Sequence, residues 1–343
     1  MEIRAADLEK DRTALIQVLR EHLTAGSNDR RFDWLYLRNP DGEARAWIAE
    51  DRGDVVGAAA VFPRRVYYEG RVQLGSVLGD FCLAPRLRVM GPAIQLFRAC
   101  LKAIQPAWVA VAFDFPSASL NAVYGRLKIP QHGRLVRLVR PLRGDHLLGD
   151  RLSNPILTKA AAAVSGLALR ALDLTARPAR GVEVATLEGR CGDEFTTLAA
   201  EHQAAYGNGV HRSAAYLNWR FGDNPYSDFE MLTARRGARL VGYAVLRRDG
   251  EHATIMDLFG AREPGIARSL VARIVTRERA RGAATIHVHM VPTHPDYPVM
   301  RRLGFLPRES APIVLFAPSS EGGVAADTAG LRAWCLVEGD RDS

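Results

Sequence analysis

The chain has 343 residues, of which 48% are apolar and 24% charged, and its formal net charge is +8. This composition excludes a disordered tail protein, and the length predicts about two globular domains. The cysteines Cys82, Cys100, Cys191 and Cys335 form no C-x-x-C pair, and Met1-Glu2-Ile3-Arg4 does not begin a signal peptide. We therefore expect a cytoplasmic protein without structural zinc.

Arginine dominates the basic residues, because only Lys10, Lys102, Lys128 and Lys159 are lysines. The planar guanidinium suits phosphate and carboxylate recognition, and a GC-rich genome produces the same bias. No helix-turn-helix, zinc-finger or aromatic-studded basic sheet motif accompanies the charge, so we expect no DNA partner and do not favour tRNA. The longest apolar-leaning stretch, 156–174, contains charged residues, so no transmembrane segment is expected.

The first part of the chain alternates helical and strand patterns. Apolar residues at helical spacing predict a helix at 8–23, and 31–37 is a second short helix or turn. Strands are expected at 46–49, 55–62, 66–68, 72–81, 108–113 and 135–139, with helices over 94–104 and 119–127. The sequence Asp51-Arg52-Gly53-Asp54 is typical of a hairpin between the first two strands.

The turn between the strand ending at Phe81 and the following helix has the sequence Arg88-Val89-Met90-Gly91-Pro92-Ala93. The start of a helix presents free backbone N–H groups and the positive end of the helix dipole. Gly91 lets the backbone approach a ligand closely, and the φ of Pro92 suits a first helical position. This turn therefore predicts a cradle for a pyrophosphate.

Arg88-x-x-Gly91-x-Ala93 resembles the Arg/Gln-x-x-Gly-x-Gly/Ala signature with which GNAT-fold acyltransferases hold acyl-coenzyme A. Pro92 departs from the usual pattern, because it removes one N–H from the cradle. The order of the expected elements over the first 140 residues also resembles the GNAT fold. The resemblance implies an α/β fold around a mixed sheet, with acetyl-CoA or another acyl-CoA as co-substrate and no metal.

The chain contains an internal repeat. Trp34-Leu35-Tyr36-Leu37-Arg38-Asn39-Pro40 recurs as Trp219-Arg220-Phe221-Gly222-Asp223-Asn224-Pro225, and Val56-Gly57 recurs as Val241-Gly242, in both cases 185 positions later. We therefore expect two tandem GNAT-like domains. Their predicted division is a first domain at 1–142, a helical linker at 143–181, a degenerate domain at 182–318, and a C-terminal linker with a possible strand at 319–343.

In the second copy, helices are expected at 195–206 and 266–279, and strands at 231–234, 240–246, 253–259 and 285–290. The counterpart of the cradle reads Ala261-Arg262-Glu263-Pro264-Gly265-Ile266-Ala267, where the spacing differs and Glu263 disfavours an anion. Met300 stands in the place of Tyr124. We expect this copy to have lost coenzyme binding and to form one wall of the acceptor site.

The resemblance also implies roles for single residues. Tyr124 falls where many family members place the tyrosine that protonates the departing thiolate, and a core-packing aromatic is the alternative. Asp80 is the leading candidate for the base that deprotonates the amine, with Asp114 second, although an aspartate at a strand end also caps neighbouring N–H groups. His287, His289 and His294 lie close in sequence, but without a ligand of fixed spacing we expect them not to hold a metal.

The candidate site residues are therefore, for catalysis, Tyr124 and Asp80; for the coenzyme, Phe81, Leu83, Arg88, Val89, Met90, Gly91, Ala93 and Ser117; and for the acceptor, Asp114, His202, Tyr206 and His211. The expected reaction is transfer of an acyl group from acyl-CoA to a primary amine of a small molecule or amino sugar, by a monomer or homodimer. Two alternatives remain: a Fem-type transferase that takes its acyl group from charged tRNA, and a non-catalytic module that binds coenzyme A or a partner.

Overall fold

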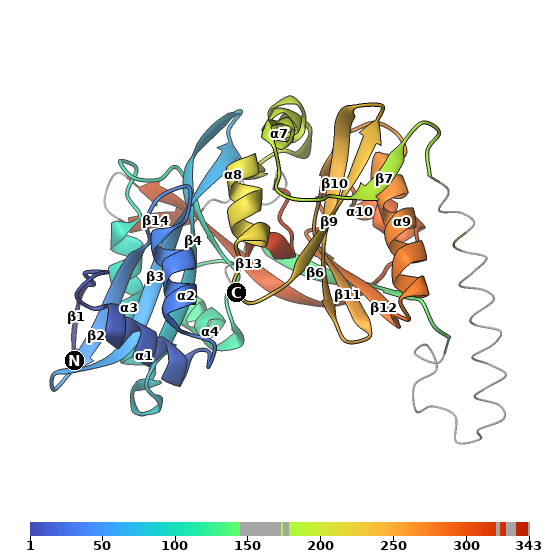
Figure 1. The fold of residues 1–343 in the computed structure, drawn as a ribbon. Helices are drawn as coiled ribbons and strands as arrows, with labels where there is room; N and C mark the ends of the chain where they lie inside the picture. The colour runs from blue at the N-terminus through green and yellow to red at the C-terminus, as the bar shows by residue number, and fades with distance from the viewer. Residues whose placement is uncertain (145–172, 174–177, 320–322, 327–333, 342–343) are drawn as a thin grey trace, which may run out of the picture.

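The computed structural model describes residues 1–144, 173, 178–319, 323–326 and 334–341. The predicted linker helix therefore lies almost wholly outside the described residues. Two α/β halves stand side by side around one mixed sheet (Figure 1). The expected α/β fold with two tandem copies is confirmed.

The first copy supplies β1 (Glu2–Ala5), α1 (Arg12–His22), α2 (Asp29–Phe32), β2 (Arg45–Asp51), β3 (Asp54–Tyr68), β4 (Arg71–Leu83), α3 (Met90–Ala103), β5 (Ala112–Asp114), α4 (Ala118–Arg126) and β6 (Gly133–Pro141). A π-helical turn, Asp33–Leu37, follows α2. β3 is one long strand where the sequence predicted two, because Pro63-Arg64-Arg65 continues in register with Ser76-Gly75-Leu74 of β4.

The second copy supplies β7 (Glu183–Thr186), α7 (Asp193–Tyr206), β8 (Gly209–Val210), α8 (Ala214–Leu217), β9 (Phe229–Arg236), β10 (Arg239–Asp249), β11 (His252–Gly260), α9 (Ile266–Ala280), β12 (Thr285–Met290), α10 (Tyr297–Arg302), β13 (Leu306–Ser319) and β14 (Gly323–Ala326). Its π-helical turn, Asn218–Gly222, is the repeat of the first. β13 was not predicted from the sequence.

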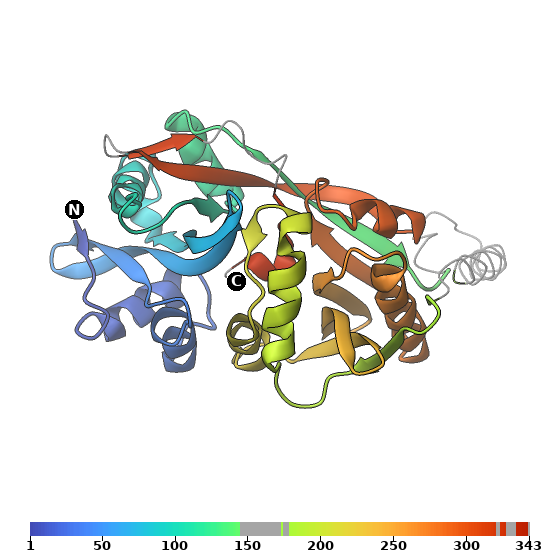
Figure 2. The same ribbon diagram turned by 90° about the horizontal axis from the view of Figure 1, so that it is seen from above.

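The two copies exchange their last long strands. β13, from the second copy, pairs with β5 of the first copy, while β6, from the first copy, pairs with β12 of the second. β6 and β13 also pair with each other, which makes the sheet continuous in the order β5-β13-β6-β12. Figure 2 shows both strands crossing from one half of the molecule to the other. The predicted boundary at residue 142 divides the chain by sequence. In space, the sheet of each half includes one strand from the other copy.

The hydrophobic core is likewise shared. One cluster of buried residues joins both copies, with Phe62 and Phe113 from the first and Trp219 and Phe221 from the second. Two further clusters lie under α3 and under α9 respectively. Because burial of apolar surface is the main stabilising term, we expect the two copies to fold as one unit.

Candidate functional site

A cavity opens where two neighbouring strands of the first copy separate. β4 and β5 are paired in parallel only at Ser76–Val77 and Ala112–Phe113. β5 then ends at Asp114, while β4 continues to Leu83. The gap leads to a cavity of about 520 Å³, lined from the first copy by Leu78, Gly79, Asp80, Phe81, Asp114, Phe115, Ser117 and Leu120, among others. This volume is typical of a small-molecule site.

β4 carries a bulge at the edge of this cavity. The register with β3 shifts between Ala58 and Ala60, so the backbone of Asp80 and Phe81 lies outside the regular ladder. Asp80 has a φ of +49°, which is unfavourable for a residue with a side chain. Bulges of this kind redirect backbone groups and recur next to active sites.

The Asp80 carboxylate holds this conformation in place. Its two oxygens accept hydrogen bonds of 2.6 Å each from the Arg31 guanidinium, and Oδ2 accepts a further one of 2.8 Å from the Tyr36 hydroxyl. Asp80 is only 8% exposed. Asp80, predicted as the leading base, therefore forms an ion pair with Arg31 at the cavity wall.

Asp114 is the second carboxyl group that lines the cavity. It lines the cavity at the end of β5, and burial raises its pKa from 3.8 to about 7. The Tyr124 hydroxyl donates a hydrogen bond to Asp114 Oδ2 and so opposes part of that rise in pKa. A group with a pKa near neutrality exchanges protons efficiently at physiological pH.

Tyr124 lies behind Asp114 and does not line the cavity. Its ring is fully buried on α4, edge-on to Phe97 at 4.8 Å between ring centroids and 5.7 Å from Phe316. Burial, followed by the charge of Asp114, raises the pKa of Tyr124 well above its usual value. Tyr124 and Asp114 are thus joined by a hydrogen bond, and of the two only Asp114 lines the cavity.

The first turn of α3 has the geometry of an anion-binding helix start. The helix begins at Met90, so Pro92 is its third residue and not its first, and Ala93 N–H donates the first helical bond to the Val89 carbonyl. Val89 and Met90 are exposed, and a Cβ added to Gly91 would meet no atom within 4 Å. Space for a ligand therefore exists in front of free N–H groups.

The remaining predicted coenzyme residues fall into three groups. Leu83 and Ala93 are buried in the core, where they position the turn without facing a ligand. The Arg88 guanidinium lies beside the turn and donates to the carbonyls of Leu83 and His22, at 3.0 and 3.3 Å. Phe81 and Ser117 line the cavity, and Ser117 caps α4 by accepting a hydrogen bond from Leu120 N–H.

Three predicted acceptor residues are not brought to this cavity. Tyr206 is buried in a separate cavity of about 480 Å³ in the second copy, beside Arg262 and Asp296. His211 lines a third cavity on β3, and His202 lies on α7 with its ring 3.7 Å from Glu201. None of the three is among the residues that line the β4–β5 cavity. The expectation that they face the coenzyme cleft is corrected, because the strand exchange determines which part of the second copy meets the first.

The second copy contributes other residues to the β4–β5 cavity. They come from the π-helical turn, the loop after it, three strands and the chain end: Arg220, Asn224, Tyr226, Ser227, Phe229, Arg247, Met256 and Arg341. The Tyr226 hydroxyl donates to the Gly26 carbonyl of the first copy at 2.7 Å. The second copy thus forms part of the wall of this cavity, with residues other than those predicted for the acceptor.

The segment 334–341 fills the corresponding strand gap of the second copy. Val291 N–H bonds the Leu336 carbonyl after β12, and Val337 forms a bridge with Met290. A Cβ added to Gly339 would lie 2.9 Å from the Met256 carbonyl on β11, so the chain end packs directly on that strand. The gap that is open in the first copy is therefore occupied in the second.

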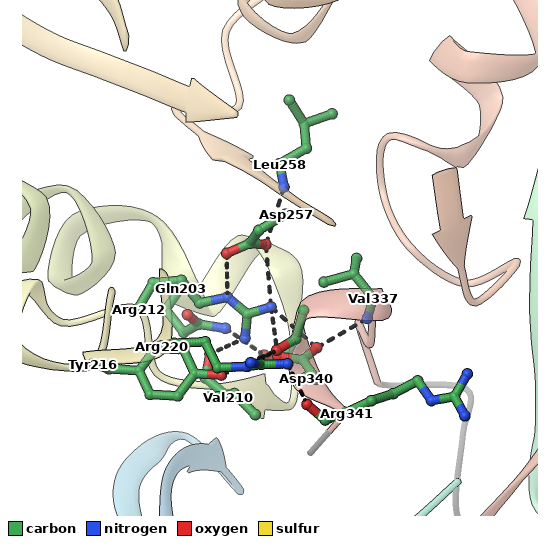
Figure 3. A network of polar contacts seen from close by, with 12 residues as sticks. Gln203, Val210, Arg212, Tyr216, Arg220, Asp257, Leu258, Val337, Asp340 and Arg341 are labelled. Carbon is green, nitrogen blue, oxygen red and sulfur yellow. Dashed lines mark hydrogen bonds and ion pairs between the residues drawn. The ribbon is translucent and has the colours of Figure 1, made fainter. Parts of the chain in front are cut away.

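A buried polar network fixes this segment (Figure 3). Arg212 bonds Asp257 at 3.3 Å and Asp340 at 3.1 Å, and Arg220 bonds the carbonyls of Gly339 and Arg341 at 2.9 and 2.6 Å. Asp257 is the counterpart of Asp80, since each lies on the gapped strand and pairs with an arginine. The sequence allowed a strand near the chain end, and Trp334 and Val337 do form isolated β-bridges, but the place of this segment in the gap of the second copy was not predicted.

The second copy also lacks the features of the first at its cradle. Gly260 N–H on β11 donates to the Tyr206 hydroxyl at 3.0 Å, and Glu263 pairs with Arg236. At the start of α9, a Cβ on Gly265 would lie 2.6 Å from Ala179 Cβ, so Ala179 packs against this glycine. Glu263, Pro264 and Gly265 also line the cavity of about 480 Å³ that contains Tyr206. The described residues include no group of three His, Cys, Asp or Glu side chains placed to hold a metal, and no described helix is long and apolar enough to span a membrane.

Neither a protein-family model nor a curated protein matches this sequence. Solved structures do match the fold. A GCN5-related N-acetyltransferase from Anabaena variabilis superposes with a TM-score of 0.67 at 13% identity, over 92% of this chain and 73% of its own. A probable N-acyltransferase from Enterococcus faecalis V583, otherwise of unknown function, gives the same TM-score and coverage at 11% identity.

A tandem GNAT protein from the clavulanic acid biosynthesis pathway, solved without AcCoA, matches over 93% of this chain and 99% of its own, with a TM-score of 0.56 and 14% identity. The chain has the tandem GNAT fold. The predicted resemblance is confirmed at the level of the fold. In the GNAT fold of this chain, the open strand gap lies in the first copy, and the gap in the second copy is filled.

Proposed function

We propose that the protein transfers an acyl group, in the simplest case acetyl, from acyl-CoA to a primary amine held between the two copies. The observation that carries this proposal is the open β4–β5 gap, where a backbone bulge and an Asp114 with a pKa of about 7 face one cavity. The filled strand gap of the second copy supports the first copy as the one that carries the reaction.

The first turn of α3 would hold the diphosphate of the donor. Its first N–H groups have no helical acceptor, and the dipole of a helix of this length favours an anion there. Gly91 offers no Cβ to obstruct that approach, and Arg88 lies beside the turn with its guanidinium on two carbonyls. The exposed apolar side chains of Val89 and Met90 would be covered by the bound donor.

The bulge on β4 would polarise the thioester carbonyl. Asp80 and Phe81 lie outside the β3–β4 ladder, so their amide groups are available to an oxygen that gains negative charge during attack. The ion pair of Asp80 with Arg31 keeps these amides in place before the substrate binds. Such preorganised donors lower the barrier because they need not rearrange during the reaction.

Asp114 would act as the base. An amine arrives protonated near neutral pH and must lose one proton before its lone pair can form the new C–N bond. The Asp114 carboxylate accepts that proton, the amine nitrogen attacks the thioester carbonyl, and the C–S bond breaks as the thiolate departs with the electron pair. The nitrogen gives up its second proton after the C–N bond has formed, and the thiolate takes up a proton to become the free thiol. Tyr124, which donates to Asp114, is a positioning residue in this scheme.

A thiol-release assay with acetyl-CoA over a panel of primary amines tests the proposal, combined with calorimetric titration of acetyl-CoA. We expect one donor to bind per chain and thiol release to depend on the amine. The proposal fails if the donor does not bind, or if it binds but no amine releases thiol. Transfer from charged tRNA without coenzyme A would instead establish the Fem-type alternative.

A further inference from the structure

The part of the cavity wall that comes from the second copy is strongly cationic. Four arginines and two aspartates line the whole cavity: Arg31, Arg220, Arg247, Arg341, Asp80 and Asp114. Arg31 and Asp80 neutralise each other through two hydrogen bonds. Since Asp114 carries a full negative charge only well above pH 7, the remaining arginines outweigh the remaining carboxylate.

Arg247 is the arginine whose charge is least compensated. It lies on β10, in register with Phe229 of β9, and both residues line the cavity. Arg247 is half-buried, and within the described part of the chain its guanidinium forms no hydrogen bond or ion pair with another residue. A partly desolvated guanidinium favours an anionic ligand that can accept its N–H groups in pairs.

Arg341 adds a second charge from the end of the chain. Arg220 fixes its backbone carbonyl, while its side chain points away from the buried network in Figure 3. The guanidinium lies 5.8 Å from the ring centroid of Phe115 and 3.6 Å from Glu338, and it lowers the pKa of Asp114. Its charge therefore acts on the same space as the proposed base.

We propose that the acceptor is an amine that also carries an anionic group, a carboxylate or a phosphate, which Arg247 and Arg341 bind. This inference rests on the proposed function. The anion is assigned to the acceptor because no residue from Leu83 to Ala93 lines this cavity, so the turn proposed for the donor diphosphate lies elsewhere. With the anion bound by the second copy, the amine is directed toward Asp114 of the first.

Matched pairs of acceptors test the proposal on the full chain. The pairs are glycine and glycinamide, phosphoethanolamine and ethanolamine, and glucosamine 6-phosphate and glucosamine. Their affinity is measured by calorimetry in the presence of coenzyme A, and turnover by thiol release. In at least one pair, we expect the anionic amine to bind at least about tenfold more tightly than its neutral counterpart. Whether this pair carries a carboxylate or a phosphate identifies the anion that the site prefers.

Arg247→Ala and Arg341→Ala are each expected to weaken the anionic acceptor about tenfold or more and to leave acetyl-CoA affinity unchanged. Arg239→Ala, on the same strand but exposed and paired with Glu201, is the control and should change neither. Circular dichroism melting curves establish that the variants are folded.

Equal binding of charged and neutral partners, no binding of any anionic probe, or weakened acetyl-CoA binding in the arginine variants would each overturn the proposal. The binding measurement does not require turnover. Selective binding of an anionic amine without thiol release therefore supports the anion site and contradicts the proposed acyl transfer. Turnover without selectivity contradicts the anion site alone.

Discussion

Trp34 and Trp219, the first residues of the repeated segment, each donate the indole N–H to the backbone carbonyl of the other, and both hydrogen bonds are 2.8 Å long. Their rings stack with centroids 5.1 Å apart. Arg64 lies over the Trp219 ring at 4.6 Å, and Arg220 over the Trp34 ring at 5.7 Å. The two copies are therefore related here by an approximate two-fold arrangement, at the boundary that closes the cavity.

Replacing either tryptophan by phenylalanine removes one of these hydrogen bonds and leaves an aromatic ring in place. We expect Trp34→Phe and Trp219→Phe each to lower the free energy of unfolding by about 1–3 kcal/mol, because a buried carbonyl loses its donor. Urea denaturation measures the change. Trp108→Phe, at a half-buried ring beneath Arg45, is the matched control and should cost less. Clearly different losses of stability in Trp34→Phe and Trp219→Phe would contradict an equal contribution of the two hydrogen bonds.

Asp114→Asn should lower the rate of acyl transfer about 10²- to 10⁴-fold, the range usual for loss of a general base. The wild-type rate should rise with pH through about 7, as Asp114 loses its proton, and the variant should lack this dependence. Initial rates of thiol release between pH 5.5 and 9 measure both. If Asp114→Asn retains the pH–rate profile of the wild type, another residue is the base.

The same variant has a predicted effect on stability with a defined sign. Because the pKa of Asp114 is raised from 3.8 to about 7 in the folded state, the folded protein holds this proton more tightly than the unfolded chain. The resulting stabilisation is complete below pH 3.8 and is lost as pH rises through about 7. Asp114→Asn should therefore gain stability relative to the wild type between pH 5 and pH 8, as measured by thermal unfolding.

Tyr124→Phe separates two roles for the phenol. If Tyr124 positions Asp114, loss of its hydrogen bond raises the pKa of Asp114, and the rate profile moves to higher pH. If Tyr124 itself protonates the thiolate, the rate falls at every pH without that displacement. We expect the displaced profile, because the hydroxyl is buried against the carboxyl group.

Gly91→Glu and Gly91→Gln form a matched pair at the start of α3. A side chain at this position meets open space, so neither change should unfold the protein. Glutamate places a negative charge where the diphosphate is expected, and we expect it to weaken acetyl-CoA binding more than glutamine does, by about fivefold or more. Calorimetry measures both affinities. Equal affinities of the two variants for acetyl-CoA would contradict binding of the diphosphate at this turn.

The sequence carried enough information for the repeat, the α/β class and the turn at Gly91, because each depends on local spacing or on a recurring segment. Asp114 was also found, as a polar residue at the end of an apolar strand. Its proton affinity was not predictable, because burial raises it and burial depends on Tyr124 and the exchanged strand around it.

The ion pair of Asp80 was not predictable for a related reason. Its partner Arg31 lies 49 residues away, and no local pattern indicates that two such residues meet. The strand exchange was equally unpredictable, since the partners of β6 and β13 lie far from them in the sequence. Interactions distant in the sequence determined which residues of the second copy reach the cavity.

The crossing of β13 also limits the order in which the molecule is assembled on the ribosome. β5 has Val314, Leu315 and Phe316 as its neighbours, so the N-terminal sheet lacks its adjoining strand until nearly the whole polypeptide has been synthesised. Until then the exposed edge of β5 is open to pairing with other nascent chains. A fragment that ends after β6 should therefore aggregate, and expression of the halves as separate polypeptides should yield folded protein only when both are produced together.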